Sequence, residues 1–231
     1  IILGKFYSEK EVGFYNQANK WNYMGHSLIS GMINGVAQPV LTQVTDDKER
    51  QLRVFRKMMR FTAFVAFPAM FGLSLIAPEL ITIAITDKWI ESALILQLLC
   101  ISGAFIPITT LCSNLVISKG KSNIYMWNAI SLGLLQLLVM YLIHPYGIQT
   151  MIVTYVCINI SWLIVWRYFV WKEIGYRFIH LLKDILPFLF IAAGVMFITS
   201  YLTNRIENIY LLFVSKIFIA ALLYILIMWI S

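Results

Sequence analysis

Long apolar runs constrain what this chain can fold into more than any other feature. A helix that crosses the roughly 30 Å hydrocarbon core of a bilayer needs about 20 mostly apolar residues. Six runs meet this need: Phe61–Ala77, Ala93–Ser118, Ile124–Ile143, Ile148–Trp166, Leu186–Leu202 and Ile209–Ile230. Backbone groups in lipid have no water partners, so each run is predicted to be helical. The alternating segments of about ten residues that build outer-membrane barrels are absent.

The composition supports a membrane protein and excludes two other classes. Only 13% of the residues are charged and 60% are hydrophobic, with a mean hydropathy of +0.79. Soluble domains carry about 25% charged and about 45–50% apolar residues, so a water-soluble enzyme is excluded. A disordered chain is excluded too, because such chains are poor in apolar residues. The three cysteines, Cys100, Cys112 and Cys157, lie in apolar runs without a CxxC pair, which predicts buried thiols rather than disulfides or zinc.

A seventh segment, Val12–Leu41, is long enough to span a membrane but is unusually polar. Its polar positions recur every three or four residues, which places them on one face of a helix. They are Asn16, Lys20, Tyr23, Ser27, Ser30, Asn34 and Gln38. A spanning helix would turn this face toward other helices or water. The alternative is an amphipathic helix on the membrane surface, but such helices favour Lys and Arg over amides and hydroxyls.

Basic residues alternate between successive connections. The connections after the first, third and fifth spans hold six, two and four Lys or Arg residues, and the others hold one, none and one. Since basic connections stay in the cytoplasm, the amino end is predicted outside and the carboxyl end inside. Most of the net charge of +7 then encodes orientation, and no nucleic-acid surface is needed. An outside start without a signal-peptide pattern fits a missing preceding span, with Ile1–Leu3 as its last turn.

The expected architecture is therefore an all-α, polytopic membrane helix bundle of about seven transmembrane helices. We expect residues 1–231 to form a single membrane domain that is part of a longer transporter, with spans at 12–41, 61–77, 93–118, 124–143, 148–166, 186–202 and 209–230. Two shorter segments, Pro78–Asp87 and Tyr176–Ile185, are predicted to lie at the membrane interface. Thr45 or Asp46 is expected to cap the helix that follows the first span.

Enzyme signatures are missing from the sequence. There is no GxSxG, HExxH, P-loop or GxGxxG motif. The three histidines, His26, His144 and His180, share no spacing that would suggest catalysis or metal binding. We therefore predict no catalytic residue, no metal site and no cofactor.

Two lysines at membrane depth are the strongest candidates for function. A lysine near the centre of a spanning helix costs about 2.5–3.5 kcal/mol on insertion scales. For Lys20, snorkelling to the headgroups and a place in a cavity both remain open, whereas the apolar surroundings of Lys216 favour a cavity. Two lysines facing one cavity would attract an anion such as a phosphate or pyrophosphate. The polar face adds Asn16, Ser27 and Asn34 as further candidates. Amides on other spans are predicted to form interhelical hydrogen bonds: Asn128, Gln136 and Asn159.

Several segments resemble the carboxyl half of bacterial polysaccharide and O-antigen (Wzx-like) flippases of the MATE/MurJ superfamily. They are GFYNQANK, APELITIAITDKWIESALILQLLCISG, SNLVISKGKSNI and YGIQTMIVTYVC. The resemblance covers essentially the whole chain and implies the last seven helices of a fourteen-helix fold. It also implies that the whole protein moves undecaprenyl-pyrophosphate-linked oligosaccharide across the bacterial inner membrane by alternating access. Other polysaccharide-assembly proteins would then be partners.

The resemblance also suggests where the substrate would bind. Cationic cavity residues of such flippases hold the pyrophosphate, and Lys20 and Lys216 are candidates by position only. The last two helices of MurJ-like relatives form an apolar groove for the lipid tail, which corresponds here to Leu186–Leu202 and Ile209–Ile230.

Two alternatives remain. A MATE-like cation-coupled drug exporter would need an intramembrane Asp or Glu, and none of the eleven acidic residues is predicted at mid-membrane. A membrane enzyme of polysaccharide assembly would need acidic or Arg- and His-rich external loops, or a DxD-type metal site. The predicted external loops are short and poor in such groups.

Overall fold

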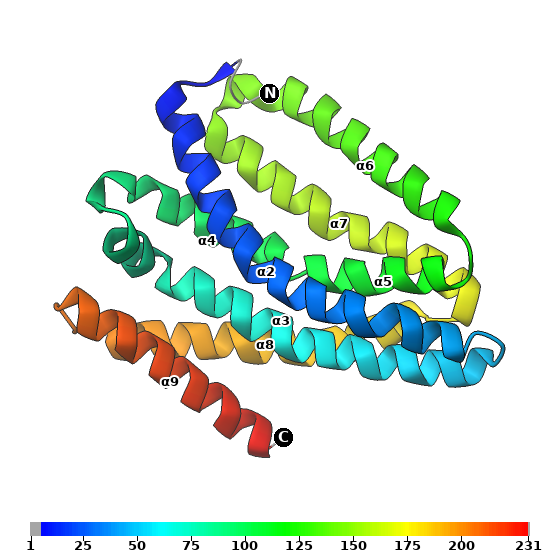
Figure 1. Cartoon of the computed structure of the whole chain (residues 1–231). Coiled ribbons are helices and arrows are strands. Elements are labelled where there is room, and N and C mark those ends of the chain that lie inside the picture. The colour runs from blue at the N-terminus through cyan, green and yellow to red at the C-terminus, as the bar shows by residue number, and fades with distance from the viewer. Residues whose placement is uncertain (1–5, 231) are drawn as a thin grey trace.

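The computed structural model describes residues 6–230, which contain helices and no strand. The predicted last turn at Ile1–Leu3 lies outside the described residues. The elements are α2 (Glu9–Gln43), α3 (Lys48–Ala84), η1 (Asp87–Trp89), α4 (Glu91–Gly103), α5 (Ile106–Ser118), α6 (Ser122–Ile143), η2 (His144–Tyr146), α7 (Ile148–Ile174), α8 (Phe178–Thr203) and α9 (Ile209–Ile230) (Figure 1). The predicted all-α fold class is confirmed.

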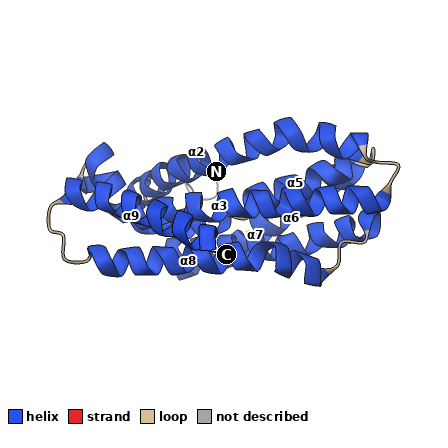
Figure 2. Ribbon diagram, turned by 90° about the horizontal axis from the view of Figure 1, so that it is seen from below, coloured by secondary structure: helices blue, strands red, loops and turns tan. Residues whose placement is uncertain are grey.

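The long helices run back and forth between two ends of the bundle, where the connections gather (Figures 1 and 2). Six segments within the described residues are long and apolar enough to cross a membrane, with α4 and α5 together forming one of them. The 35-residue helix α2 is long enough but is not among the six. Its many amides and hydroxyls lower its hydropathy, so that its crossing the membrane stays a prediction.

The two predicted interfacial segments belong largely to longer helices. The predicted interfacial segment Pro78–Asp87 is not separate, because α3 continues without a break to Ala84. The predicted segment Tyr176–Ile185 is likewise not separate, since α8 begins at Phe178 and passes through Pro187. A proline removes one intrahelical hydrogen bond but does not end a helix that is held by its neighbours.

The start of α3 also differs from its prediction. Asp47, rather than Thr45 or Asp46, is the N-cap of the helix, and its Oδ1 accepts a hydrogen bond from the Arg50 N–H at 2.9 Å. The same kind of residue therefore serves the predicted role one or two positions further along the chain.

The predicted span Ala93–Ser118 consists of two helices. Helix α4 ends at Gly103, and α5 begins at Ile106 with Pro107 in its first turn, where a missing N–H costs nothing. At this break α2 approaches closely. A Cβ added to Gly103 would clash with the Asn22 side chain of α2 and with the methyl end of Met70 on α3, so a larger residue here requires both side chains to shift.

We expect the substitution Gly103→Ala to destabilise the protein by about 1–3 kcal/mol, as overpacking of a closed core does. The clash involves the Asn22 side chain on α2, which is 5% exposed and has little room to move. Thermal unfolding of the purified protein would measure the loss. Gly133→Ala on α6 is the matched control, because a Cβ there meets no atom within 4 Å. Equal melting temperatures for the two variants would contradict the prediction.

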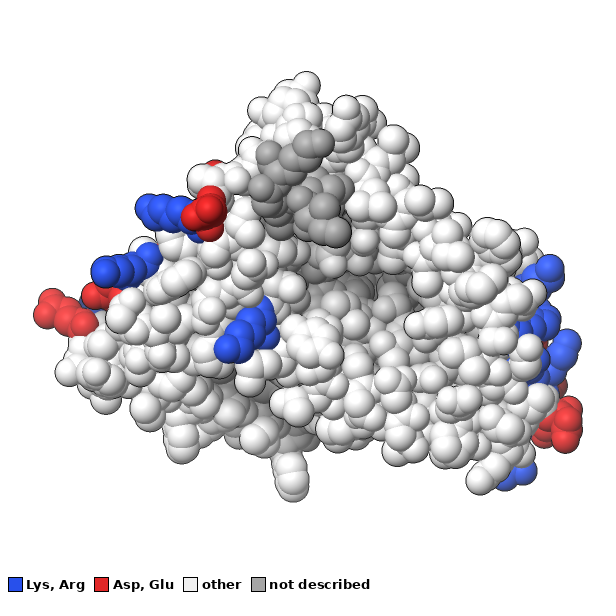
Figure 3. Space-filling view, turned by 45° about the horizontal axis from the view of Figure 1, so that its top comes forward, with Lys and Arg blue, Asp and Glu red and all other residues white. Residues whose placement is uncertain are grey.

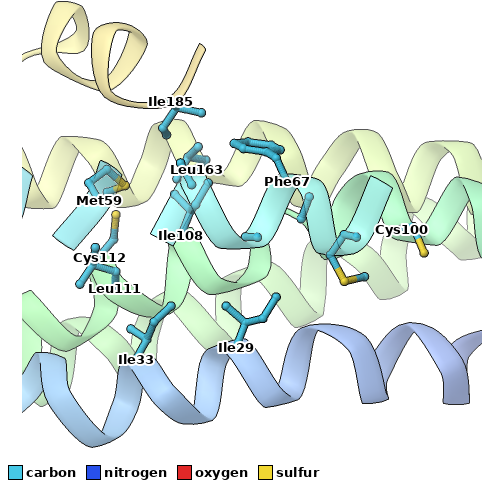
Figure 4. Packing of buried hydrophobic residues seen from close by; sticks show 14 of the residues in the cluster. Ile29, Ile33, Met59, Phe67, Cys100, Ile108, Leu111, Cys112, Leu163 and Ile185 are labelled. Atoms are coloured by element: carbon cyan, nitrogen blue, oxygen red, sulfur yellow. The ribbon is translucent and has the colours of Figure 1, made fainter. Parts of the chain in front are cut away.

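The apolar core lies where α2, α3, α4, α5, α7 and α8 meet. Figure 4 shows side chains from these helices directed into one interior: Ile29, Ile33, Met59, Phe67, Cys100, Ile108, Leu111, Leu163 and Ile185. Helices α6 and α9, by contrast, are almost unburied along their most apolar segments. Two of the three cysteines, Cys100 and Cys112, are buried as predicted, but Cys157 on α7 is exposed.

Side-chain contacts bring the three basic connections to the same end of the bundle. Lys119 Nζ donates to the Thr45 carbonyl at 2.7 Å, which joins two of them, and Lys121 pairs with Glu173 next to the third. At the opposite end, the Tyr7 hydroxyl donates to the His144 carbonyl at 2.9 Å. Figure 3 shows most Lys, Arg, Asp and Glu side chains of one face at two opposite ends, with few charged side chains between them.

Candidate functional site

A cavity of about 650 Å³ lies among α2, α3, α8 and α9. Its wall is almost entirely apolar, and Lys216 is the only charged residue in it. The residues that line it are Gly25, Leu28, Ile29, Pro68, Ala69, Gly72, Leu73, Leu75, Ile76, Ala192, Val195, Met196, Lys216, Ile217, Ala220, Ala221, Tyr224 and Ile225.

Small residues create the space. Helix α3 contributes Ala69 and Gly72, α8 contributes Ala192, and α9 contributes Ala220 and Ala221. The side chains of these residues are too small to fill the space between the helices. The result is an apolar space beside a lysine, which suits a ligand with a long hydrocarbon part and an anionic group.

Lys216 has a buried acidic partner that the sequence did not suggest. Its Nζ lies 2.6 Å from Glu79 Oε1 and also donates to the Leu75 carbonyl at 3.2 Å. Both side chains are largely buried, at 12% and 7% exposed, and Glu79 Oε2 has no hydrogen-bond partner among the described residues. The sequence placed Glu79 at the interface, and the structure places it inside the bundle on α3.

Two prolines of α3 free carbonyl groups that neighbouring helices then use. Pro68 cannot donate to Phe64, whose carbonyl instead accepts from the Tyr224 hydroxyl of α9 at 2.9 Å. Pro78 leaves the Ser74 carbonyl free in the same way, and Gln97 Nε2 of α4 donates to it at 3.2 Å.

Helix α9 is therefore attached to α3 at two polar points, Lys216 and Tyr224. They are eight residues apart, or about 12 Å along the helix axis. The cavity lies between these points, and α9 closes one of its sides.

The structure does not bring all predicted site residues together. Lys20 and Asn16 are exposed on α2, do not line the cavity and make no ion pair or hydrogen bond with the described residues. Ser27 Oγ donates to the Met24 carbonyl of its own helix at 3.3 Å. Asn34 Oδ1 accepts from Asn114 Nδ2 of α5 at 2.8 Å. Of the five candidates, Lys216 alone lies in the cavity.

The amides on other spans behave in two ways. Gln136 Nε2 of α6 donates to Asn159 Oδ1 of α7 at 3.3 Å, which is the predicted interhelical hydrogen bond. Asn128 instead donates within α6, to the Ile124 carbonyl at 3.0 Å.

A second polar cluster, which sequence reasoning missed, joins α3 to α8 at the basic end. The Asp184 side chain is fully buried. It accepts two bonds from Arg56, each 2.9 Å long, one from Arg60 Nε at 2.7 Å and one from the Tyr176 hydroxyl at 3.3 Å. The available signal was an acid directly after Lys183 and just before the apolar run Leu186–Leu202, but no sequence pattern links it to α3.

Part of the chain is similar in sequence to proteins of bacterial polysaccharide biosynthesis. A family model described as "Polysaccharide biosynthesis protein" matches residues 1–94. A Klebsiella pneumoniae protein described as an uncharacterized membrane protein in the cps region is 34% identical over 120 residues, which are 52% of this chain and 24% of that protein. The Escherichia coli lipopolysaccharide biosynthesis protein WzxC is 23% identical over 124 residues, or 54% of this chain and 25% of that protein. The matched segment thus spans about a quarter of the length of these relatives.

The fold has a solved counterpart. The structure of the lipid II flippase MurJ in an inward closed conformation matches 96% of this chain and 47% of its own, with a TM-score of 0.73 and 19% sequence identity. An identity this low shows the fold alone. The chain resembles Wzx-like polysaccharide flippases in sequence and has a MurJ-like fold.

Proposed function

We propose that this chain is the carboxyl half of a flippase that moves an undecaprenyl-pyrophosphate-linked oligosaccharide across the bacterial inner membrane by alternating access. Its residues 1–231 form one membrane domain. The observation that carries the proposal is the apolar cavity with Lys216 at its edge, because a lipid-linked anion combines a hydrocarbon chain with phosphate. The sequence relatives support the same class of protein.

In this proposal the apolar wall of α3, α8 and α9 holds part of the polyprenyl chain, and Lys216 meets the phosphate. An ammonium group has three N–H donors. Glu79 and the Leu75 carbonyl take two of them. The third is free for a phosphate oxygen, so that the buried pair and a bound anion can share the lysine. Asn16 and Lys20, exposed on α2, face the part of the protein that lies outside this chain.

The direct test uses the full-length protein in cells that lack their own O-antigen flippase. The oligosaccharide lipid is expected to reach the periplasmic leaflet only when the protein is present. Failure to translocate it, in cells that contain the protein at normal abundance, would contradict the proposal.

A cation-coupled exporter is the second candidate function, because Glu79 is a buried carboxylate with one oxygen that has no partner among the described residues. Cation-dependent extrusion of lipophilic drugs, without translocation of the oligosaccharide lipid, would favour it over the flippase.

The proposed orientation places the basic end in the cytoplasm, the amino end of the chain in the periplasm and the carboxyl end in the cytoplasm. Single cysteines introduced into residues 45–51 should react with a membrane-impermeant reagent only after the cytoplasmic side is opened. Cysteines in residues 144–149 should react in intact spheroplasts. The background is a variant in which Cys157, the exposed native cysteine, is replaced by Ser. The reverse labelling pattern would contradict the orientation.

A further inference from the structure

A second cavity, of about 580 Å³, lies at the end of the bundle opposite the basic connections. It is formed where α2, α4 and α7 begin, and it is more polar than the first cavity. Its walls include the carboxylates of Glu11 and Glu91, the Gln149 amide, the rings of Phe14 and Tyr146, and Gly147.

Local structure fixes the walls of this cavity. Gly147 turns the chain from η2 into α7 with a φ of 91°, a conformation that favours glycine. The bond from the Tyr7 hydroxyl to the His144 carbonyl holds the α6–α7 connection against the start of α2. On the α2 side, Phe14 packs edge-on against Trp89, with ring centroids 5.7 Å apart. These contacts hold the three helix starts together around the cavity.

The cavity offers both acceptors and donors that no described residue uses. Glu11 Oε2 bonds Ser8, which leaves Oε1 unengaged, and the Glu91 carboxylate has only a 3.8 Å contact with Lys10. The Gln149 amide makes no hydrogen bond with any described residue, and it can both donate and accept. The first turn of α7 has no side-chain cap, so its N–H groups are available as well.

The chemistry of these groups fits a sugar. Each sugar hydroxyl donates and accepts, and a site that holds it needs carboxylate or amide oxygens together with N–H donors. The ring of Tyr146, which is 74% exposed, offers a flat apolar face for the C–H side of a sugar ring. Anionic sugars fit poorly because two carboxylates line the cavity. Hydrogen bonds from Ser8 lower the pKa of Glu11, so its carboxyl group ionises even more readily than that of an isolated glutamate.

We propose that this cavity is a subsite for one uncharged sugar unit of the transported oligosaccharide, and that Glu11 and Glu91 disfavour uronic acids. The inference rests on the proposed function for the source of the sugar. That the cavity binds a sugar is inferred independently, from its geometry and its hydrogen-bonding groups. In the proposed orientation the subsite lies on the periplasmic side, where it would hold the glycan after the lipid head has crossed.

The test measures sugar binding to the purified full-length protein by saturation-transfer NMR, with methyl glucoside and methyl glucuronide as probes. Methyl glucoside is expected to bind, and methyl glucuronide to bind at least about fivefold more weakly. Gln149→Leu and Tyr146→Ala should each weaken methyl glucoside binding by about tenfold, since each removes one recognition element. Glu91→Gln should reduce the difference in affinity between methyl glucoside and methyl glucuronide. Tyr201→Ala is the control, because that tyrosine is 81% exposed and lies outside the cavity.

Several results would overturn the subsite. They are equal binding by the wild type and Gln149→Leu, a preference for methyl glucuronide, or binding that disappears when divalent cations are removed. The last result would identify a cation site between the two carboxylates. Sugar binding without flipping activity would leave the subsite standing and remove the proposed function. Flipping activity without sugar binding would support the proposed function and rule out the subsite.

Discussion

Replacement of Asp184 by Ala is expected to destabilise the protein by about 3 kcal/mol, the low end of the range for a broken buried ion pair. Asp184 is fully buried and compensates two guanidinium groups, those of Arg56 and Arg60. Without its carboxylate, two like charges remain side by side, and the buried Tyr176 hydroxyl loses its acceptor. The low end applies because Arg56 and Arg60 are 27% and 53% exposed, and water screens part of the repulsion.

Thermal unfolding of the purified protein would show this loss as a fall of several degrees in the melting temperature. The melting temperature of Asp184→Asn should lie between those of the wild type and Asp184→Ala. The single amide oxygen of Asn accepts fewer of the four donated hydrogen bonds than the two carboxylate oxygens do. Glu49→Ala is the matched control, since its contact with Arg53 is exposed and such pairs contribute about 0–1 kcal/mol. If Asp184→Ala melts at the same temperature as this control, the cluster does not hold α3 to α8.

The apolar runs predicted the helical core of every span but not the helix ends. The reason is physical: hydropathy marks the part of a helix in the hydrocarbon, while the helix continues into the headgroup region on mixed residues. Helix α3 begins thirteen residues before the predicted run at Phe61, through a basic segment that includes Arg56 and Arg60. Hydropathy does not mark the break between α4 and α5, because Gly103 and Pro107 lower the hydropathy of this apolar run too little to divide it.

Lys216 was found from the sequence because a charge inside an apolar run is conspicuous and costly. Its partner Glu79 could not be found, since 137 residues separate the two and no helix periodicity connects them. The same limit applies to the carbonyls freed by Pro68 and Pro78. The prolines are visible in the sequence, but the Tyr224 and Gln97 side chains that use those carbonyls come from other helices.

Lys216 is expected to be needed for transport beyond its pairing with Glu79. Replacing Lys216 by Met should reduce export of the oligosaccharide lipid about tenfold, which corresponds to about 1.4 kcal/mol and to the loss of one charge-assisted hydrogen bond to phosphate. This single variant also leaves Glu79 buried without its partner, and that alone can destabilise the protein. A second variant must therefore separate the two effects.

The double variant Lys216→Met with Glu79→Gln removes both charges and with them the uncompensated carboxylate. If Lys216 served only to neutralise Glu79, the double variant would export normally. If Lys216 also meets the phosphate, the double variant recovers its melting temperature and abundance but still exports about tenfold less. Tyr224→Phe is the matched control, because it breaks the other polar attachment of α9 and changes no charge. Since this control loosens α9 as well, a loss of export confined to the Lys216 variants would reflect the charge and not the position of α9. Normal export by the double variant would remove Lys216 from the substrate site and leave the pair as a structural contact between α3 and α9.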